Sequence, residues 1–327
     1  MIFAEMSGSA VADAAALGSV LIPAMVRKGY PRNFAVSVVS CAATIAIIIP
    51  PSIPMILYAV IAEVSVTKMF LAGFIPGVLF GGAMMTITYV LATIRHYPIE
   101  QKFLLRELIR TFVAALPSFC VPLVILGGIF GGIFTATESA GVGVVAALIV
   151  GFFVHRELEI RELPRLLIDA ALQTAVVMLI VAGSAHMGSF LANEQVPQKL
   201  AQSILGVSRE PVVVLLFLNV MFLVAGMFLH SAAAIVTLVP IVLPLVKAAG
   251  IDPIHFGLVM TINLGIGQQT PPVASVLLTT CSIGRISIAE AMKVCYLFIL
   301  AMIGVLLLVT YVPEVPLFLP NLLGGRD

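Results

Sequence analysis

The chain has 327 residues, of which 61% are hydrophobic and 10% charged, and its formal net charge is +1. Soluble domains carry about 25% charged residues, so this composition, with a mean hydropathy of +1.17, indicates an integral membrane protein. The near-zero net charge excludes an extended basic surface, and we expect no nucleic-acid partner. The four cysteines lie in apolar segments without metal-ligand or disulfide spacing, which indicates small buried hydrophobic residues.

Apolar segments of helical length recur along the chain and predict an all-α polytopic membrane protein. They contain Gly and Pro and are mostly longer than the alternating strands, about ten residues each, of an outer-membrane barrel. Two shorter apolar segments, 212–228 and 232–247, meet at Leu229-His230-Ser231, where we expect a re-entrant hairpin. Uninterrupted spans are expected over 9–25, 69–93, 111–133, 140–155, 166–191 and 288–312.

Two further apolar segments are interrupted by paired prolines. Segment 33–62 contains Pro50-Pro51, and segment 254–280 contains Pro271-Pro272. Proline removes a backbone donor and clashes with the preceding turn, so each helix must break there. In hydrocarbon, a broken backbone persists only where protein or a water-filled cavity satisfies the freed groups. Each break therefore predicts an ion or substrate site near the middle of the membrane.

The two broken segments belong to an internal repeat. A shift of 221 positions aligns Pro23 with Pro244, Gly29 with Gly250, and the first proline pair with the second. If each broken segment crosses once and the hairpin is re-entrant, eleven of the 17 lysines and arginines lie on one face. The positive-inside bias places that face in the cytoplasm. The Gly29 turn then lies inside and the Gly250 turn outside, which predicts inverted structural repeats.

We accordingly predict three parts. Residues 1–93 are the C-terminal part of the first repeat, and residues 94–110 form a cytoplasmic amphipathic linker. Residues 111–327 form the second repeat, with its hairpin at 211–248, its broken helix at 254–281 and a final span. The second copy has about 115 residues for which the first copy has no counterpart. We therefore expect roughly 110 residues of the first repeat to be missing, through a misassigned start codon or a truncated gene.

Several motifs together resemble one known family, the large membrane subunit of tripartite ATP-independent periplasmic (TRAP) transporters. The resemblance implies an elevator-type, ion-transporter-like fold with re-entrant hairpins and broken helices, in the bacterial inner membrane. It implies sodium-coupled import of a small organic acid, of the C4-dicarboxylate, sialic acid or keto-sugar acid type. The motifs are Met6-Ser7-Gly8-Ser9-Ala10-Val11-Ala12-Asp13, Ile49-Pro50-Pro51-Ser52-Ile53-Pro54, Gly132-Ile133-Phe134-Thr135-Ala136-Thr137-Glu138, Gly250-Ile251-Asp252-Pro253 and Gly267 with Thr270-Pro271-Pro272.

The same resemblance implies what the protein works with. The protein partners would be a periplasmic substrate-binding protein and a small membrane (Q) subunit, within the lipid bilayer. We expect no cofactor and no metal other than Na⁺ as the coupling ion, and no enzymatic activity. The sequence contains no His-Glu-x-x-His motif and no nucleotide-binding loop, so an ion gradient must supply the energy.

The resemblance implies one sodium site in each repeat, at a hairpin tip and a helix break. A half-helix C-terminus leaves carbonyl oxygens without intrahelical partners, which suits Na⁺. At one position, relatives commonly have Gly where this chain has Ala46, and Ala disfavours a left-handed turn. The candidate sodium ligands are Ser7, Gly8, Ser9, Thr44, Ala46 and Pro50 in the first repeat, and Asn263, Gly265, Gly267 and Thr270 in the second.

A substrate carboxylate is expected between the two repeats, near the half-helix N-termini that begin at Ser52 and Val273. The other substrate-binding candidates are His230, Ser231 and Gln268. Each candidate also has a structural interpretation, because serines can join helices by hydrogen bonds and proline pairs can be packing kinks.

Two acidic residues within the motifs are expected to make local hydrogen bonds. Asp13 either orients the first hairpin tip or makes a structural hydrogen bond, and Glu138 is expected to cap the turn at Thr135.

Two other functions remain as alternatives to a TRAP permease. A membrane channel could use similar re-entrant elements. An ion-coupled organic-anion permease that works without a binding protein is the other alternative.

Overall fold

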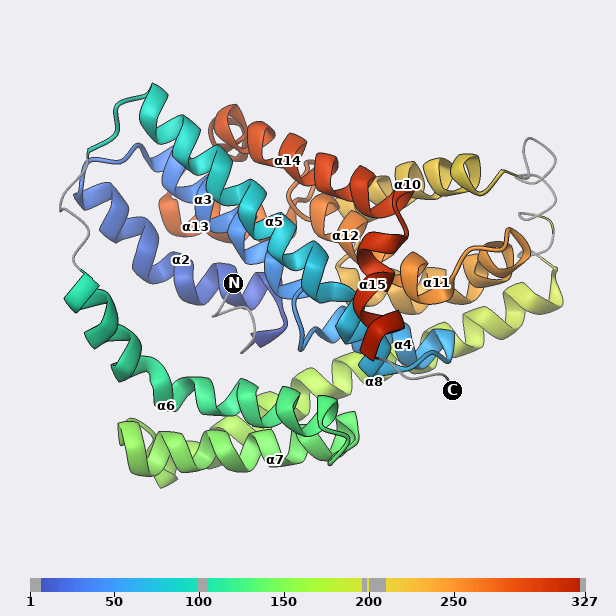
Figure 1. The fold of residues 1–327 in the computed structure, drawn as a ribbon, viewed down its shortest axis with the longest axis horizontal. Coiled ribbons are helices and arrows are strands. Elements are labelled where there is room, and N and C mark those ends of the chain that lie inside the picture. The colour runs from blue at the N-terminus through green and yellow to red at the C-terminus, as the bar shows by residue number, and fades with distance from the viewer. Residues whose placement is uncertain (1–6, 99–104, 196–198, 200–209, 324–327) are drawn as a thin grey trace. The chain divides into compact units, whose positions relative to one another are not determined.

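The computed structural model describes residues 7–98, 105–195, 199 and 210–323, and its regular elements there are all helices. The chain divides into two compact units. Unit 1 comprises Met1–Pro98 and Gly183–Asp327, and unit 2 comprises Ile99–Ala182. The expected all-α architecture is confirmed for the described residues (Figure 1).

The first half of unit 1 is a hairpin arm, a broken helix and a long closing helix. Ser9 and Ser65 cap two of these helices, each accepting a hydrogen bond from a backbone N–H three residues on. Between them the chain turns at Gly29, whose φ of 89° suits glycine. The elements are α2 (Ala10–Arg27), α3 (Arg32–Ala43), the 3₁₀ helix η1 (Thr44–Ile47), α4 (Ile53–Ala62) and α5 (Val66–Ile94).

The second half of unit 1 repeats this order. Gly250 has a φ of 70° at the turn that matches Gly29, and Ser287 caps the closing helix as Ser65 does. The proline pairs Pro50-Pro51 and Pro271-Pro272 are both cis. The elements are α10 (Pro211–Phe228), α11 (Ser231–Ala248), α12 (Pro253–Gly267), α13 (Ser275–Gly284), α14 (Ile288–Tyr311) and α15 (Glu314–Leu323).

The two halves of unit 1 pack against each other reciprocally. The hairpin arm α2 contacts α13, which follows the second break, and α11 contacts α4, which follows the first. The broken helices do the same with the closing helices, α3 with α14 and α12 with α5 (Figure 1). Buried aromatic rings occupy the centre, where Phe256 lies 6.3 Å from Tyr58 and 5.8 Å from Phe222 between ring centroids. The core of unit 1 is therefore built jointly by both halves.

Unit 2 is built on α6 (Leu105–Phe130) packed against α7 (Ala136–Ile149). Thr135 and Glu138 form a capping box at the start of α7, in which Glu138 Oε2 accepts from the Thr135 N–H at 2.8 Å. The predicted cap is thus confirmed. The chain continues through η2 (Val150–His155), η3 (Ile160–Glu162) and α8 (Leu163–Asn193), whose last residues belong to unit 1.

Within the described residues, seven helices are long and apolar enough to cross a membrane. The number is eight if α6, which bends by 58°, counts as a span. Large apolar side chains such as Val20, Met85 and Leu179 are exposed on their faces, as expected of helices surrounded by lipid. One helix was not expected from the sequence: α15 follows the last span and packs on α5. Helix α6 begins at Leu105, within the stretch expected to be a linker.

Candidate ion and substrate site

Both hairpin tips and the first helix break meet at one small cavity. Its volume is about 30 Å³. This is room for one or two water-sized groups, whereas pockets for small organic ligands have roughly 300 Å³ or more. In this conformation the cavity therefore has space for an ion or water, not for an organic acid. It is lined by Gly8, Ser9, Ala10, Ile47, Ile53, Pro54, His230, Ser231 and Ala232.

Three helix N-termini point their first residues at this cavity. Helix α2 begins at Ala10, α4 at Ile53 and α11 at Ser231, and all three residues line it. The first N–H groups of a helix have no intrahelical partner and carry the positive end of its dipole. The surroundings of the cavity therefore favour an anion.

The first hairpin tip is held by the hydroxyl of Ser7. This hydroxyl donates to the carboxylate of Asp13 and accepts a hydrogen bond from the Ser9 N–H at 3.1 Å. Asp13 is buried, with only 1% of its surface exposed. The expected interaction between Asp13 and the tip is therefore present, and it sets the path of the backbone that leads into α2.

Gly8 fixes the first tip against the first break. Its φ is 62°, and a Cβ atom there would lie 2.7 Å from the carbonyl oxygen of Pro51. Its own carbonyl oxygen accepts a hydrogen bond from the Ile53 N–H at 3.4 Å. Only glycine permits both the backbone conformation and this approach. The second tip makes a similar contact, because the Met227 carbonyl accepts from the Val273 N–H at 3.3 Å.

The first break consists of a 3₁₀ turn and a serine cap. Thr44 and Ala46 lie on η1, and Ala46 has a negative φ, so its methyl group meets no left-handed turn. The Ser52 hydroxyl donates to the Ile47 carbonyl at 2.7 Å and accepts from the Met55 N–H at 3.4 Å. Ser52 is fully buried and does not line the cavity. Pro50 lies within the same break, between η1 and Ser52.

The second break follows directly on a close helix contact. Gly267 ends α12, and a Cβ atom there would lie 2.5 Å from backbone atoms of Gly226 on α10. The Thr270 hydroxyl donates to the Ile266 carbonyl at 3.0 Å. Because the hydroxyl hydrogen is used in this way, the lone pairs of the oxygen can face a cation.

The two breaks touch each other through a side-chain network. A Cβ atom on Gly265 would lie 2.8 Å from the Thr44 methyl group, so glycine is needed for this approach. The Gln269 amide donates to the Thr44 hydroxyl at 2.7 Å and to the Ser40 carbonyl at 2.9 Å, and it accepts from the Ser40 hydroxyl at 2.6 Å. Sequence reasoning did not single out Ser40 or Gln269. Their only signal was a polar side chain inside an apolar segment.

Asn263 belongs to a second buried network. Its amide donates to Asn219 Oδ1 at 2.6 Å, and the Asn219 amide donates to the Thr310 hydroxyl at 3.2 Å. Among the described residues, neither Asn263 Oδ1 nor Gln268 Nε2 has a hydrogen-bond partner, although both atoms are buried. Such atoms are rare in native proteins and are available to a ligand or water.

The candidates thus separate into groups. Gly8, Ser9, His230 and Ser231 come together at the cavity, although 221 residues or more separate one tip from the other. Thr44, Gly265 and the second break meet at the network described above. Ser52, Gln268 and Val273 do not line the cavity, and Val273 is 42% exposed.

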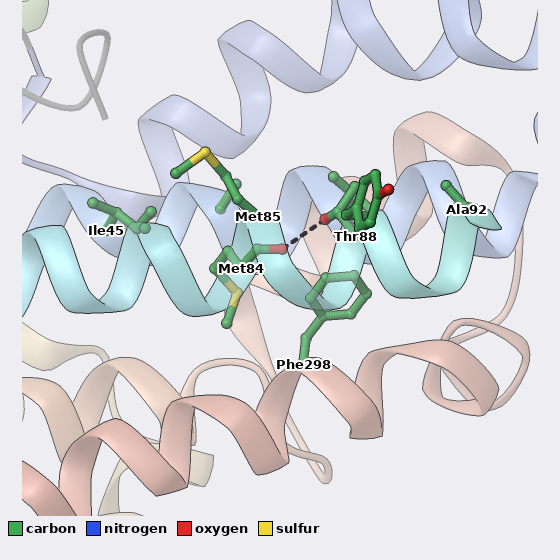
Figure 2. A pocket seen from close by; sticks show the side chains of 10 residues that line it. Ile45, Met84, Met85, Thr88, Ala92 and Phe298 are labelled. Atoms are coloured by element: carbon green, nitrogen blue, oxygen red, sulfur yellow. Dashed lines mark hydrogen bonds between the residues drawn. The ribbon is translucent and has the colours of Figure 1, made fainter. Parts of the chain in front are cut away.

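A separate cavity of about 820 Å³ lies between α3, α5 and α14. Its lining is apolar and includes Ile45, Met84, Met85 and Phe298 (Figure 2). The one hydrogen bond drawn there joins the Thr88 hydroxyl to the Met84 carbonyl at 2.8 Å, within α5. This cavity therefore offers little to hold an ion or a carboxylate. Within the described residues, no three His, Cys, Asp or Glu side chains are grouped to hold a metal ion.

Comparison with known proteins gives one consistent result. Residues 1–315 match the family described as tripartite ATP-independent periplasmic transporter, DctM component. The chain is 38% identical over 324 residues to the C4-dicarboxylate TRAP transporter large permease protein DctM of Pseudomonas aeruginosa, covering 99% of this chain and 76% of that protein.

Two fused or longer relatives match equally well. The chain is 40% identical over 322 residues to the isethionate TRAP transporter permease protein DctMQ of Oleidesulfovibrio alaskensis, covering 97% of this chain. It is 37% identical over 323 residues to the sialic acid TRAP transporter permease protein SiaT of Haemophilus influenzae, covering 99% of this chain. The chain spans 50% and 52% of these two relatives. The chain therefore belongs to the DctM family of TRAP transporter large permease subunits, and it is a multi-pass protein of the bacterial inner membrane and not an enzyme.

Proposed function

We propose that this permease imports a small organic acid, coupled to Na⁺, by an elevator mechanism. The observation that carries the proposal is the convergence of two hairpin tips and three helix N-termini on one cavity. The relatives named above are described as carrying C4-dicarboxylates, isethionate and sialic acid, all of which are organic anions. An anion would be stabilised by the positive helix ends, with His230 and Ser231 as polar contacts from the second tip.

Sodium would bind at the two breaks. In the first repeat we assign Ser7, Gly8, Ser9, Thr44, Ala46 and Pro50 to this site, and in the second Asn263, Gly265, Gly267 and Thr270. The carbonyl oxygens that end η1 and α12 would supply oxygen ligands at the negative ends of half-helices. Ser52, Gln268 and Val273, which lie apart from the cavity, would reach the substrate only after the tips have separated.

The repeats would be inverted, with the parts 1–93, 94–110 and 111–327 assigned as above. The reciprocal packing of α2 on α13 and of α11 on α4 supports this proposal, because a pseudo-two-fold axis exchanges the two pairs. An elevator needs one body that carries the sites and another that does not. All the candidate residues lie in unit 1, which suits that division.

The permease would receive its substrate from a periplasmic binding protein and would work with a small membrane subunit. The family description names a tripartite system, and one relative is called DctMQ, which supports a second membrane subunit. Residues of unit 2 and the exposed apolar faces of the spans would contact lipid and that subunit.

Uptake in proteoliposomes tests the proposal. The permease is reconstituted with its small subunit, its binding protein is added outside, and uptake of labelled C4-dicarboxylate, sialic acid and keto-sugar acid is measured. We expect saturable uptake of one of them that stops when the sodium gradient is collapsed. Uptake that persists without the gradient would refute sodium coupling. Uptake without the binding protein would indicate an independent permease, and a conductance far above transporter turnover would indicate a channel.

A further inference from the structure

Gln269 joins the second break to the first repeat by three buried hydrogen bonds. The side chains of Ser40, Thr44 and Gln269 are all fully buried. A glutamine amide has two N–H donors and an acceptor oxygen. Both donors are used, on the Ser40 carbonyl and the Thr44 hydroxyl, and the oxygen accepts from the Ser40 hydroxyl. A buried polar network that is satisfied in this way fixes the relative position of the elements it joins.

The position of this network is specific to the proposed ion sites. Gln269 lies between Gly267 and Thr270 of the second break, and Thr44 begins the 3₁₀ turn of the first. Gly265 also lies close to Thr44, because a Cβ atom on Gly265 would overlap the Thr44 methyl group. A movement of the second break therefore cannot leave the Thr44 hydroxyl unaffected.

The link exists once and not twice. The shift of 221 positions that aligns the proline pairs places Ile48 opposite Gln269. Ile48 is buried and has no side-chain hydrogen-bonding group. The residue of the first break that corresponds to Gln269 therefore cannot make equivalent hydrogen bonds to the second repeat. The repeat symmetry is therefore broken at Gln269, whose side chain reaches from the second break to the first.

We propose that Gln269 is a positioning residue that makes the two sodium sites bind cooperatively. This rests on the proposed sodium coupling. A sodium ion at the second break orders the backbone around Gly267 and Thr270 and so holds the Gln269 amide in place. That amide then fixes the Thr44 hydroxyl for a second ion at the first break. Coupling of two sites through a shared element is reciprocal, so either ion strengthens the binding of the other.

Sodium activation curves of two variants test the link. Gln269→Leu removes all three hydrogen bonds with little change in volume, and Ser40→Ala removes only the bond from the serine hydroxyl. Ser37→Ala is the matched control, since Ser37 is a buried serine one turn earlier on α3 whose hydroxyl donates to the Asn33 carbonyl at 2.7 Å and the Ala291 carbonyl at 3.1 Å. Initial uptake rates are measured against sodium concentration in proteoliposomes that also contain the small subunit, with the binding protein added outside.

The unmodified permease is expected to show a Hill coefficient for sodium clearly above one, with two as the upper limit for two coupled sites. In Gln269→Leu it should fall towards one, with about a tenfold higher sodium concentration for half-maximal uptake. Ser40→Ala should show a smaller change in the same direction, and Ser37→Ala should match the unmodified protein. Thermal unfolding of each variant without sodium separates a loss of packing from a loss of cooperativity.

Three results would overturn the inference. One is a steep sodium curve that both variants retain, and another is a Hill coefficient of one in the unmodified permease. The third is an equal loss of steepness in Ser37→Ala. If Gln269→Leu does not fold, Ser40→Ala decides. Uptake that is independent of sodium in the unmodified protein is a different result, because it refutes the proposed function itself.

Discussion

Tyr58 donates its hydroxyl hydrogen to the carbonyl oxygen of Pro253, 2.6 Å away, although 195 positions separate the two residues in the sequence. Tyr58 is on α4 of the first repeat, and Pro253 is the first residue of α12 in the second. The tyrosine ring lies directly against Gly257, where a Cβ atom would overlap it. The two repeats therefore meet here through one ring, one glycine and one hydrogen bond.

Substitutions at this contact should destabilise unit 1. We expect Gly257→Ala to lower the free energy of unfolding by about 1 to 3 kcal/mol, because the added methyl group forces the ring to move. Tyr58→Phe should lower it by about 1 kcal/mol, because the Pro253 carbonyl loses its donor. Thermal unfolding in detergent measures both. Gly304→Ala is the control, since a Cβ atom there meets no atom of the described residues within 4 Å. Equal losses in both glycine variants would contradict the packing argument.

Gly8→Ala should strongly reduce transport with little effect elsewhere in the protein. Its Cβ atom would lie 2.7 Å from the Pro51 carbonyl oxygen, so the first tip would have to withdraw from the first break. We expect uptake to fall at least about tenfold, equivalent to about 1.4 kcal/mol of lost interaction. Uptake corrected for the amount of protein in the membrane measures this.

Gly29→Ala tests whether backbone strain at a positive φ is enough to reduce transport, without the contact that Gly8 makes with the first break. Gly29 also has a positive φ, of 89°, but among the described residues its would-be Cβ meets only a Pro98 side-chain carbon, at 3.6 Å. The substitution should cost about 1 kcal/mol of stability and leave uptake per molecule nearly unchanged. Similar uptake by both glycine variants would remove the special role of Gly8.

Thr270→Val should raise the sodium concentration for half-maximal uptake about tenfold, which corresponds to the loss of about 1.4 kcal/mol of binding. The reason is the loss of a hydroxyl oxygen whose hydrogen is already donated to the Ile266 carbonyl. Thr270→Ser keeps the oxygen and should stay close to the unmodified protein. Sodium activation of uptake distinguishes the two; if serine and valine behave alike, the hydroxyl is not a ligand.

His230→Asn should weaken substrate binding without altering the sodium requirement. His230 Nδ1 accepts a hydrogen bond from the Ala232 N–H at 3.4 Å, which leaves the proton on Nε2 as a donor for an anion. Asparagine preserves the cap on α11 but not the reach of the imidazole. We expect the KM for the organic acid to rise about tenfold, a loss of about 1.4 kcal/mol. His155→Asn, a substitution in unit 2, is the control.

Much of the helical framework is readable from the sequence because lipid imposes simple rules. The breaks at Pro50-Pro51 and Pro271-Pro272, and the cap formed by Thr135 and Glu138, follow from local chemistry that tertiary structure does not override. The apolar lengths of α5 and α14 likewise come within a few residues of the expected spans. Helix α15 is not evident from the sequence, because its short apolar run contains prolines, which normally break helices.

The candidate site is harder to predict from the sequence, because it depends on which helices of one half of unit 1 pack against which helices of the other. Nothing local in Ser9 or His230 indicates that the two tips line the same cavity. The Ser40–Gln269 contact requires knowing that α12 lies across the first break, which only the folded core determines. Ser52 has a partner that the sequence does not reveal, because its hydroxyl donates to the Ile47 carbonyl across the first break.

The contact between Gln269 and Thr44 also constrains how the protein is made. The two residues are 225 positions apart, so at about 5 to 20 residues per second the ribosome needs roughly 10 to 45 s to supply the glutamine after the threonine. During that interval Ser40 and Thr44 are already synthesised, and their hydroxyl groups have no partner from the second repeat. Until α12 is made, those hydroxyl groups must bond to water or to carbonyl oxygens of their own helix. The contact between the two halves of unit 1 can therefore form only late in synthesis, after α12 and the second break have been made.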